Sequence, residues 1–237
     1  MKNVIVMFSV LILVLSLCVS CSQEPETEYK VGDKGPAGGY VFYDKGKYSN
    51  GWRYLEAAPA DLRVVNGTPT VDSSATGYSD AAPQYQFGFY RLSDSASNVF
   101  VNGGTSYNAT ECTKADVGEG KRNTQLLVSA MGSNAYSAHN GSSKTSNYAA
   151  RLCDILTYTV DGKTFDDWFL PSNDELFLMY ENLGYNDLGD FDDDDCYWSS
   201  SEYTDASYAI QKYFGSGAFG TGRERSEYFR VRPARAF

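Results

Sequence analysis

The sequence of 237 residues contains a single histidine, His139, and its one pair of cysteines with the Cys-x-x-Cys spacing, Cys18 with Cys21, belongs to the N-terminal apolar run. No such pair occurs after Cys21, which excludes a zinc site of that type in the rest of the sequence. The histidine stands among serine, asparagine and glycine, and no Gly-x-Ser-x-Gly turn lies near Ser199–Ser201 in the segment YWSSSEY at 197–203. Since a serine hydrolase needs a base beside its nucleophile, we expect no serine nucleophile in this segment.

Positive charge is also scarce. Lysine and arginine total 20 against 30 aspartate and glutamate residues, which gives a formal net charge of −10. A surface of that sign repels phosphate groups. The balance therefore argues against nucleic acid, or an anionic lipid surface, as a partner for the whole protein.

One long apolar run occurs, from Val4 to Val19, directly after the charged Lys2. A run of this kind is typical of a secretory signal and is short for a membrane-spanning helix. We therefore expect residues 1–20 to be a signal peptide.

The end of the run, Val-Ser-Cys at 19–21, resembles the lipobox of bacterial lipoproteins, except that Cys18 replaces the usual leucine. The resemblance implies that Cys21 becomes a lipidated N-terminus, which would anchor the protein in the cell envelope, at the outer membrane or the cell surface. Residues 21–31 are then a polar tether. The alternative is an ordinary signal peptide that is cut near Ser20.

The remaining residues, 32–237, are enough for a substantial core, and we expect them to form one domain. Three cysteines lie in this domain: Cys112, Cys153 and Cys196. In an exported protein two of the three are expected to pair, and the sequence leaves all three pairings open.

Strands are predicted at both ends of the domain. Residues Tyr40–Tyr43 and segment 51–59 are predicted to pair, whereas residues 66–120 hold so few aliphatic side chains that long irregular loops are expected. Three further strands are predicted at Tyr197–Ser201, Tyr208–Phe214 and Tyr228–Arg235. With helices between these two groups, the pattern indicates an α+β fold whose two ends meet in one sheet.

Two amphipathic patterns predict helices in the middle of the domain. In the first, Thr124 caps a segment that Gly132 ends. The second has an apolar face formed by Tyr148, Leu152, Cys153 and Leu156. After it, Asp161-Gly162 predicts a tight hairpin.

A third helix is predicted after Ser172. Glu175 follows three residues later, which forms a capping box worth about 1 kcal/mol. The apolar face then comprises Leu176, Met179, Tyr180 and Leu183, and Gly184 stands where a glycine commonly ends a helix. We therefore assign Ser172 and Glu175 a structural role rather than a catalytic one.

The aromatic residues Trp168 and Trp198 are predicted to anchor the core. Tyr197 and Trp198 are neighbours in a strand and so point to opposite faces, which predicts one ring in the core and the other at a rim. The serines that follow are expected to allow close packing of that strand.

Three segments together resemble the Lcl C-terminal domain family of bacterial exported domains. They are GPAGGYVFYDKG at 35–46, WFLPSNDELFLMYENLG at 168–184, and YWSSSEY at 197–203 with FRVRPARAF at 229–237. The family is grouped with C-type-lectin-like and formylglycine-generating-enzyme-like folds. The resemblance covers roughly residues 32–237 and implies a compact domain with a mostly antiparallel sheet, two or three helices and long polar loops.

Kinship with the formylglycine-generating enzymes raises the possibility of an oxidase. That chemistry uses two neighbouring cysteines late in the chain, and only Cys196 lies late here. We therefore expect no enzyme and no cofactor.

A calcium-dependent lectin site is a second possibility, because calcium takes about six to eight oxygen ligands. The acidic residues near the predicted core strand are Asp190, Asp192, Asp193, Asp194, Asp195 and Glu202. Of these, Asp192, Asp194 and Glu202 are weak candidates for calcium. EF-hand spacing and the EPN, QPD and WND triplets of sugar-binding C-type lectins are absent, which favours a solvated acidic loop.

A third possibility is recognition of an anion or a sulfated glycan. The last residues carry Arg223, Arg225, Arg230, Arg232 and Arg235 against Glu224 and Glu227. Guanidinium groups suit sulfate and carboxylate. The alternative is that these arginines brace the acidic loop at 190–195 and belong to the fold.

The function we expect is that of an envelope-anchored binding module or adhesin for glycans or extracellular proteins. The alternative is a structural envelope lipoprotein without a soluble ligand. A partner is expected to contact Asp192, Asp193, Asp194, Asp195, Glu202, Tyr203, Arg223 and Arg225.

Overall fold

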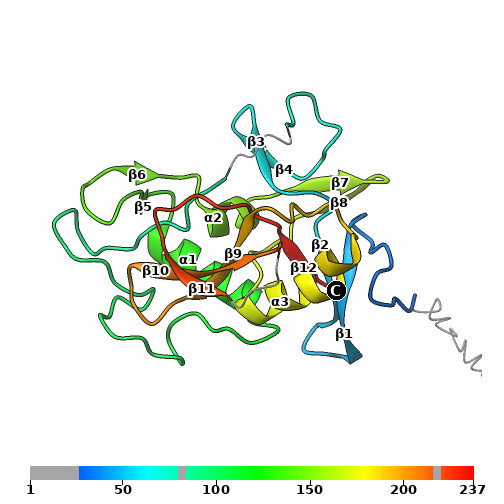
Figure 1. Ribbon diagram of the computed structural model, residues 1–237, viewed down its shortest axis with the longest axis horizontal. Helices are drawn as coiled ribbons and strands as arrows, with labels where there is room; N and C mark the ends of the chain where they lie inside the picture. The colour runs from blue at the N-terminus through cyan, green and yellow to red at the C-terminus, as the bar shows by residue number, and fades with distance from the viewer. Residues whose placement is uncertain (1–26, 80–83, 216–219) are drawn as a thin grey trace, which may run out of the picture.

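A computed structural model describes residues 27–79, 84–215 and 220–237 (Figure 1). These residues form an α+β fold with three α-helices and several small antiparallel sheets, which confirms the predicted class. The predicted signal peptide and Cys21 lie outside the described residues, so lipidation stays a prediction. Within the described ranges we find no helix with the length and hydrophobicity that crossing a bilayer requires.

The two ends of the domain meet in one sheet, as predicted. Strands β1 (Tyr40–Ser49) and β2 (Trp52–Ala57) form an antiparallel hairpin, and β12 (Ala234–Ala236) pairs with the other edge of β2. Asn50 and Gly51 in the hairpin turn have φ angles of 53° and 85°, the left-handed conformation that a two-residue turn of this kind requires.

A second sheet has the order β11–β10–β9. Its strands are β9 (Cys196–Glu202), β10 (Tyr208–Tyr213) and β11 (Thr221–Glu224). The strand predicted at Tyr228–Arg235 is not continuous. Phe229 and Arg230 form single bridges to Tyr85 and Tyr197 before the chain joins the first sheet as β12.

Three small hairpins complete the strands. They are β3 (Arg63–Val65) with β4 (Thr68–Thr70), β5 (Ala135–Tyr136) with β6 (Lys144–Thr145), and β7 (Tyr158–Val160) with β8 (Lys163–Phe165). The last is the predicted hairpin, with φ angles of 50° at Asp161 and 75° at Gly162. Between β4 and the first helix, the described residues form turns and single bridges, as predicted for this polar stretch.

Helix α1 (Gly120–Met131) begins before the predicted cap at Thr124. Thr124 is instead buried in the second turn, where its hydroxyl oxygen accepts a hydrogen bond of 2.9 Å from the amide of Leu170. Gly132 ends the helix as predicted. Helix α2 (Ala149–Asp154) is short, and the four residues of its predicted apolar face are buried.

Helix α3 (Asn173–Asn182) has the predicted capping box. The Ser172 hydroxyl accepts from the Glu175 amide at 3.3 Å, and the Glu175 carboxylate accepts from the Ser172 amide at 2.8 Å. The helix ends with Leu183 as its C-cap, and Gly184 follows at the predicted position. Gly184 does not take a positive φ, however, because the chain continues into the short 3₁₀ helix η1 (Gly184–Asn186), and Asp187 takes the left-handed conformation with φ 54°.

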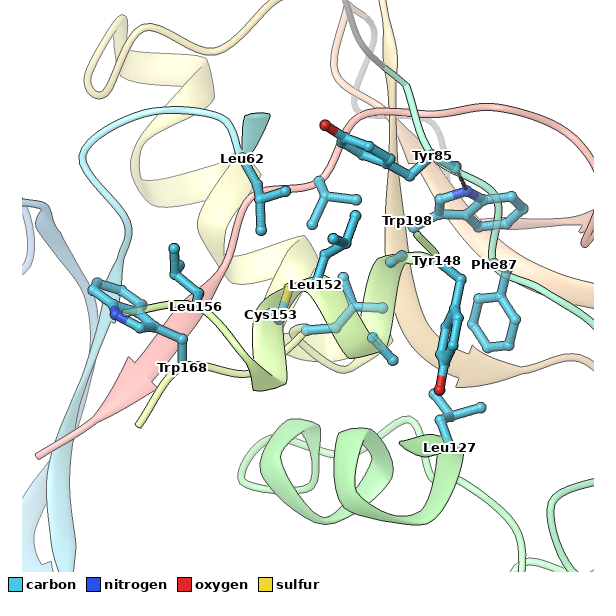
Figure 2. Packing of buried hydrophobic residues seen from close by; sticks show 14 of the residues in the cluster. Leu62, Tyr85, Phe87, Leu127, Tyr148, Leu152, Cys153, Leu156, Trp168 and Trp198 are labelled. Carbon is cyan, nitrogen blue, oxygen red and sulfur yellow. Dashed lines mark hydrogen bonds between the residues drawn. The ribbon is translucent and has the colours of Figure 1, made fainter. Parts of the chain in front are cut away.

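The larger core surrounds α2. In Figure 2 the residues Leu152, Cys153 and Leu156 lie between Trp168 on one side and Tyr148 on the other. Trp198 closes the far side and donates from its indole nitrogen to the Tyr85 carbonyl at 2.8 Å.

A second core cluster packs α3 against the first sheet and contains Tyr197. The prediction of a rim position for one ring of the Tyr197–Trp198 pair is therefore wrong, because strand β9 lies between two cores and both rings are fully buried.

The expected disulfide is absent from the described residues, in which Cys112, Cys153 and Cys196 are all free. Cys153 lies in the larger core, and Cys112 packs in a separate small cluster with Phe100 and Ala206. Burial raises the pKa of the Cys153 thiol well above its ordinary value, which makes it a packing residue rather than a nucleophile.

Candidate functional site

A buried cluster of charges, centred on Asp61, lies beneath the acidic loop. The Asp61 carboxylate accepts from Arg232 Nε at 2.8 Å and from Arg230 Nη1 at 2.9 Å. The hydroxyl of Tyr197 donates to the same carboxylate at 3.1 Å. These three donors offset the cost of burying the Asp61 charge. Because two of them come from Arg230 and Arg232, Asp61 also holds the last segment of the chain against the loop before β3.

Arg230 connects Asp61 to the acidic loop. Its Nε donates to Asp195 Oδ2 at 2.9 Å, and its Nη2 donates to Asp192. Burial acts against the charge of Arg230, but the hydrogen bonds to Asp61 and Asp195 outweigh it, and the pKa of Arg230 is raised. Asp192 and Asp195 therefore face a cation that belongs to the protein.

Arg232 holds the backbone of the same loop. Its Nη1 donates to the Gly189 carbonyl at 2.6 Å and its Nη2 to the Asp190 carbonyl at 3.2 Å. The guanidinium carbon also lies 4.0 Å from the centre of the Phe191 ring. Of the two alternatives for the C-terminal arginines, the structure shows bracing for Arg230 and Arg232.

These contacts bear on the calcium candidates. Arg230 already neutralises Asp192, and Glu202 takes part in a separate buried ion pair. In the part of the chain that the structure describes, no three His, Cys, Asp or Glu side chains are grouped as metal ligands would be. Asp192, Asp194 and Glu202 are thus not brought together as one site.

Glu202 and Arg225, which we expected at a binding rim, are buried together. Both side chains have an exposed fraction of 0%, and Arg225 Nη2 lies 2.8 Å from Glu202 Oε1. The amides of Val101 and Thr113 also donate to the Glu202 carboxylate. The expectation of an exposed rim at these two residues is wrong, because each charge compensates the other inside the protein.

The other predicted contact residues remain accessible. Asp193, Asp194 and Arg223 are exposed, and Tyr203 has an exposed fraction of 43%. The Tyr203 ring lies against Gly222 of β11, where a Cβ would come within 2.8 Å of the ring. The predicted face is therefore reduced to these four side chains.

Four residues were predicted to have a structural role, and all four lie in the interior. Trp168, Ser172, Glu175 and Trp198 are all buried. The Glu175 carboxylate accepts hydrogen bonds from backbone amides, among them that of Gly118 at 2.8 Å. Burial nevertheless raises the pKa of Glu175 to about 7.

A polar hollow that the sequence did not predict lies among the long loops. We call it the loop hollow; its volume is about 570 Å³, and the lining residues used below are Arg91, Asn98, Thr105, His139, Asp205 and Ser207. The volume falls within the range of about 300–1,000 Å³ that is usual for small-ligand sites.

One arginine organises the loop hollow. Arg91 is buried, and its Nη1 donates to the Gly141 carbonyl at 2.5 Å, while its Nη2 donates to the carbonyls of Ala138 and His139. Its Nε donates to Asn98 Oδ1 at 2.6 Å. Arg91 thereby fixes the loop between β5 and β6 against the loop that carries Asn98.

The side chains at the mouth of the loop hollow connect three loops. Asn98 Nδ2 lies 3.0 Å from His139 Nδ1 and 3.5 Å from Ser207 Oγ. Asp205 accepts from the Ser207 amide at 2.8 Å, which leaves its second carboxylate oxygen, Oδ2, directed at no hydrogen-bond donor among the described residues. An acceptor, an amide and a hydroxyl therefore lie close together at this opening.

No protein-family model matches this chain, and no curated protein matches it either. The resemblance of three segments to the Lcl C-terminal domain family accordingly stays a prediction. The only sequence signal for the loop hollow is Arg91, which is the one lysine or arginine between Arg63 and Lys114, because the other walls of the hollow come from the distant loops that carry His139 and Asp205.

Proposed function

We propose that this protein is an exported, lipid-anchored binding protein that holds a glycan in its loop hollow. The observation that carries the proposal is the lining of that hollow. It consists of hydroxyl, amide, imidazole and carboxylate groups, and its apolar contributors among the described residues are two alanines, Ala96 and Ala206.

The chemistry of sugars matches such a lining. Each sugar hydroxyl both donates and accepts hydrogen bonds, so a sugar needs partners of both kinds close together. Asp205 supplies an acceptor, and Ser207 and Thr105 can rotate their hydroxyls to suit. Asn98 supplies the donor group Nδ2, since its Oδ1 already accepts from Arg91 Nε at 2.6 Å. An aromatic or lipid ligand would find too little apolar surface here.

The loops that carry these groups are rigid in a way that favours binding. Arg91 holds three backbone carbonyls, so the order of the loops does not have to be gained when a ligand arrives. The hairpin β5–β6 and the loops beside it lie at one end of the molecule, and the sheet of β1, β2 and β12 lies at the other (Figure 1).

The lipid anchor and the finer fold belong to the same proposal. The segment Val19-Ser20-Cys21 supports lipidation of Cys21, and mass spectrometry of the mature N-terminus tests it. The sheet in which both ends of the domain meet, the three helices and the long loops support a C-type-lectin-like arrangement.

A glycan array probed with the full chain tests the function, with and without calcium. We expect binding to one class of glycan, which Asn98→Ala and Asp205→Ala weaken by about tenfold each, because each removes a polar partner from the opening. The matched control is Asp193→Ala, an exposed aspartate that does not line the loop hollow, which should bind as the wild type does.

Three results would contradict the proposal. If no glycan binds, the alternative of a structural envelope lipoprotein without a soluble ligand gains support. Binding that survives Asn98→Ala and Asp205→Ala but not Asp193→Ala would place the site at the acidic loop. Binding that requires calcium would also favour that loop.

A further inference from the structure

A second hollow lies between the β1–β2 hairpin and the start of α1. We call it the hairpin hollow; its volume is about 550 Å³, and it shares no lining residue with the loop hollow. The lining residues that matter here are Lys45, Trp52, Val117, Lys121, Phe169 and Ala236. This site is independent of the proposed glycan site.

The inner wall of the hairpin hollow is apolar. Trp52, Val117 and Ala236 are half-buried and pack against a core cluster that includes Phe169. The backbone before α1 packs closely against the tryptophan, since a Cβ at Gly118 would lie 3.2 Å from the Trp52 ring. Trp52 is thus held in place with part of its ring open, whereas Trp168 and Trp198 are buried.

Two lysines stand on opposite walls of this apolar surface. The Lys45 ammonium lies 3.7 Å from the centre of the Trp52 ring and donates to the Ser49 carbonyl at 2.6 Å. Lys121 is exposed on α1. Within the described residues neither ammonium group forms an ion pair, although the protein carries a formal net charge of −10.

The position of Lys121 contradicts the usual charge pattern of a helix. The first turn of a helix favours acidic residues, because the helix dipole is positive there. The first turn of α1 has no acidic residue and contains Lys121 and Arg122. Negative charge at this end of the helix comes from the N-cap residue Glu119 and from the buried Glu175, but neither forms an ion pair with Lys121.

The two acidic residues that line the hairpin hollow have partners within the protein. Glu119 lies 3.5 Å from Lys114 and 3.7 Å from Arg122, although its Oε2 accepts no hydrogen bond among the described residues. Glu175 accepts from the Gly118 amide at 2.8 Å and is buried. The free charge at this hollow is therefore positive, and an apolar surface lies directly beneath it.

We propose that the hairpin hollow binds a small organic anion with a flat apolar body, such as an aromatic carboxylate. The anionic group pairs with Lys45 and Lys121, and the apolar body lies against Trp52, Val117 and Ala236. Charge-assisted hydrogen bonds fix its orientation, and burial of the apolar body supplies the rest of the affinity.

Titration calorimetry of the full chain with 2-naphthoate tests this site, and 2-naphthamide serves as the neutral analogue of the same shape. We expect 2-naphthoate to bind at least about tenfold more tightly than the amide. The double variant Lys45→Gln, Lys121→Gln should abolish that preference. Lys47→Gln is the matched control, because Lys47 is exposed on the same hairpin and does not line the hollow.

A second readout uses the one tryptophan that is partly open. Iodide should quench Trp52 emission, and saturating 2-naphthoate should protect it; the variant Trp52→Phe should remove the quenchable component. Equal affinity for the acid and the amide, or a preference that survives the double lysine variant, would overturn the proposal, as would no binding at millimolar 2-naphthoate.

These outcomes are separate from those of the glycan experiment. Asn98→Ala and Asp205→Ala should leave 2-naphthoate binding unchanged, because neither residue lines the hairpin hollow. Loss of 2-naphthoate binding in those variants would show that the acid binds in the loop hollow instead.

Discussion

Two regions of this protein bury arginine in opposite ways. At Asp61, Arg230 and Arg232 are buried with carboxylates, which come from the loop before β3 and from the acidic loop. At the loop hollow, Arg91 is buried with backbone carbonyls and one amide side chain. The first arrangement uses the acidic side chains for the fold, while the second orders the loop backbone and leaves the Asp205 Oδ2 atom for a ligand.

Glu175 belongs with Arg91 in this comparison. It is a buried carboxylate that backbone amides stabilise in place of a cation. Because dipoles compensate burial less than an opposite charge does, the pKa of Glu175 rises to about 7.

The largest effect is expected for Asp61→Ala. Loss of the carboxylate leaves Arg230 and Arg232 buried without their shared partner, which should lower the free energy of unfolding by about 3–5 kcal/mol. Denaturant titration measures the change. The protein that remains folded should bind glycan with unchanged affinity, and a loss below about 1 kcal/mol would show that the cluster is not the main brace of this region.

A smaller loss of stability, but a larger loss of function, is expected for Arg91→Met. Three carbonyls lose their donor, which should cost about 1–3 kcal/mol, and the loops around the hollow lose their order. Glycan binding should therefore fall more than in Asp61→Ala. Arg91→Lys, which keeps the charge and loses the fork of donors, should restore only part of the binding.

The third prediction concerns pH and Glu175. The folded pKa of about 7 lies above the ordinary 4.5, so the folded protein binds the extra proton between these values. The contribution of this group is therefore fully present below about pH 4.5 and is lost as the pH rises through 7. Thermal unfolding should be measured for the wild type and for Glu175→Gln at several pH values in this range. The free energy of unfolding of the wild type should fall by on the order of 1–3 kcal/mol in total as the pH rises, and that of the variant should not.

The smallest effect is expected for Arg223→Ala, compared with Arg225→Ala. Arg223 is exposed, whereas Arg225 is paired with Glu202 in the interior. The melting temperature should stay the same in Arg223→Ala and should be much lower in Arg225→Ala. A salt-dependent loss of glycan binding in Arg223→Ala alone would return the sulfated-glycan hypothesis to this arginine.

The parts of the fold that short-range patterns control could be predicted. Ser172 with Glu175 forms the capping box, and Asp161-Gly162 forms the hairpin, because a few neighbouring residues decide each of these structures. Gly184 marks the end of α3 as predicted, but not through a left-handed conformation. A Cβ there would lie 3.0 Å from Phe214, so the glycine is explained by close packing with a distant residue.

The site was harder to predict than the fold, because its contacts also join residues that are distant in the sequence. Asp61 stands in AAPADLR with no neighbour that suggests three donors, and Arg225 resembles Arg223 in sequence although one is buried and the other exposed. The pairing of Asp61 with Arg230 and Arg232 depends on contacts between residues more than a hundred positions apart. Composition alone does not show them.

The position of the segment from Arg230 to Ala236 has a consequence for how the chain acquires its structure. Its ion pairs reach Asp61 and Glu56 across 169 to 179 residues of sequence, and β12 completes the sheet that β1 and β2 begin. Contacts between residues so far apart in the sequence form late and slow the folding reaction. A nascent chain that has not yet reached Arg230 therefore lacks the C-terminal arginine partners of Glu56 and Asp61, and we expect chains arrested before that point to stay open and sensitive to protease.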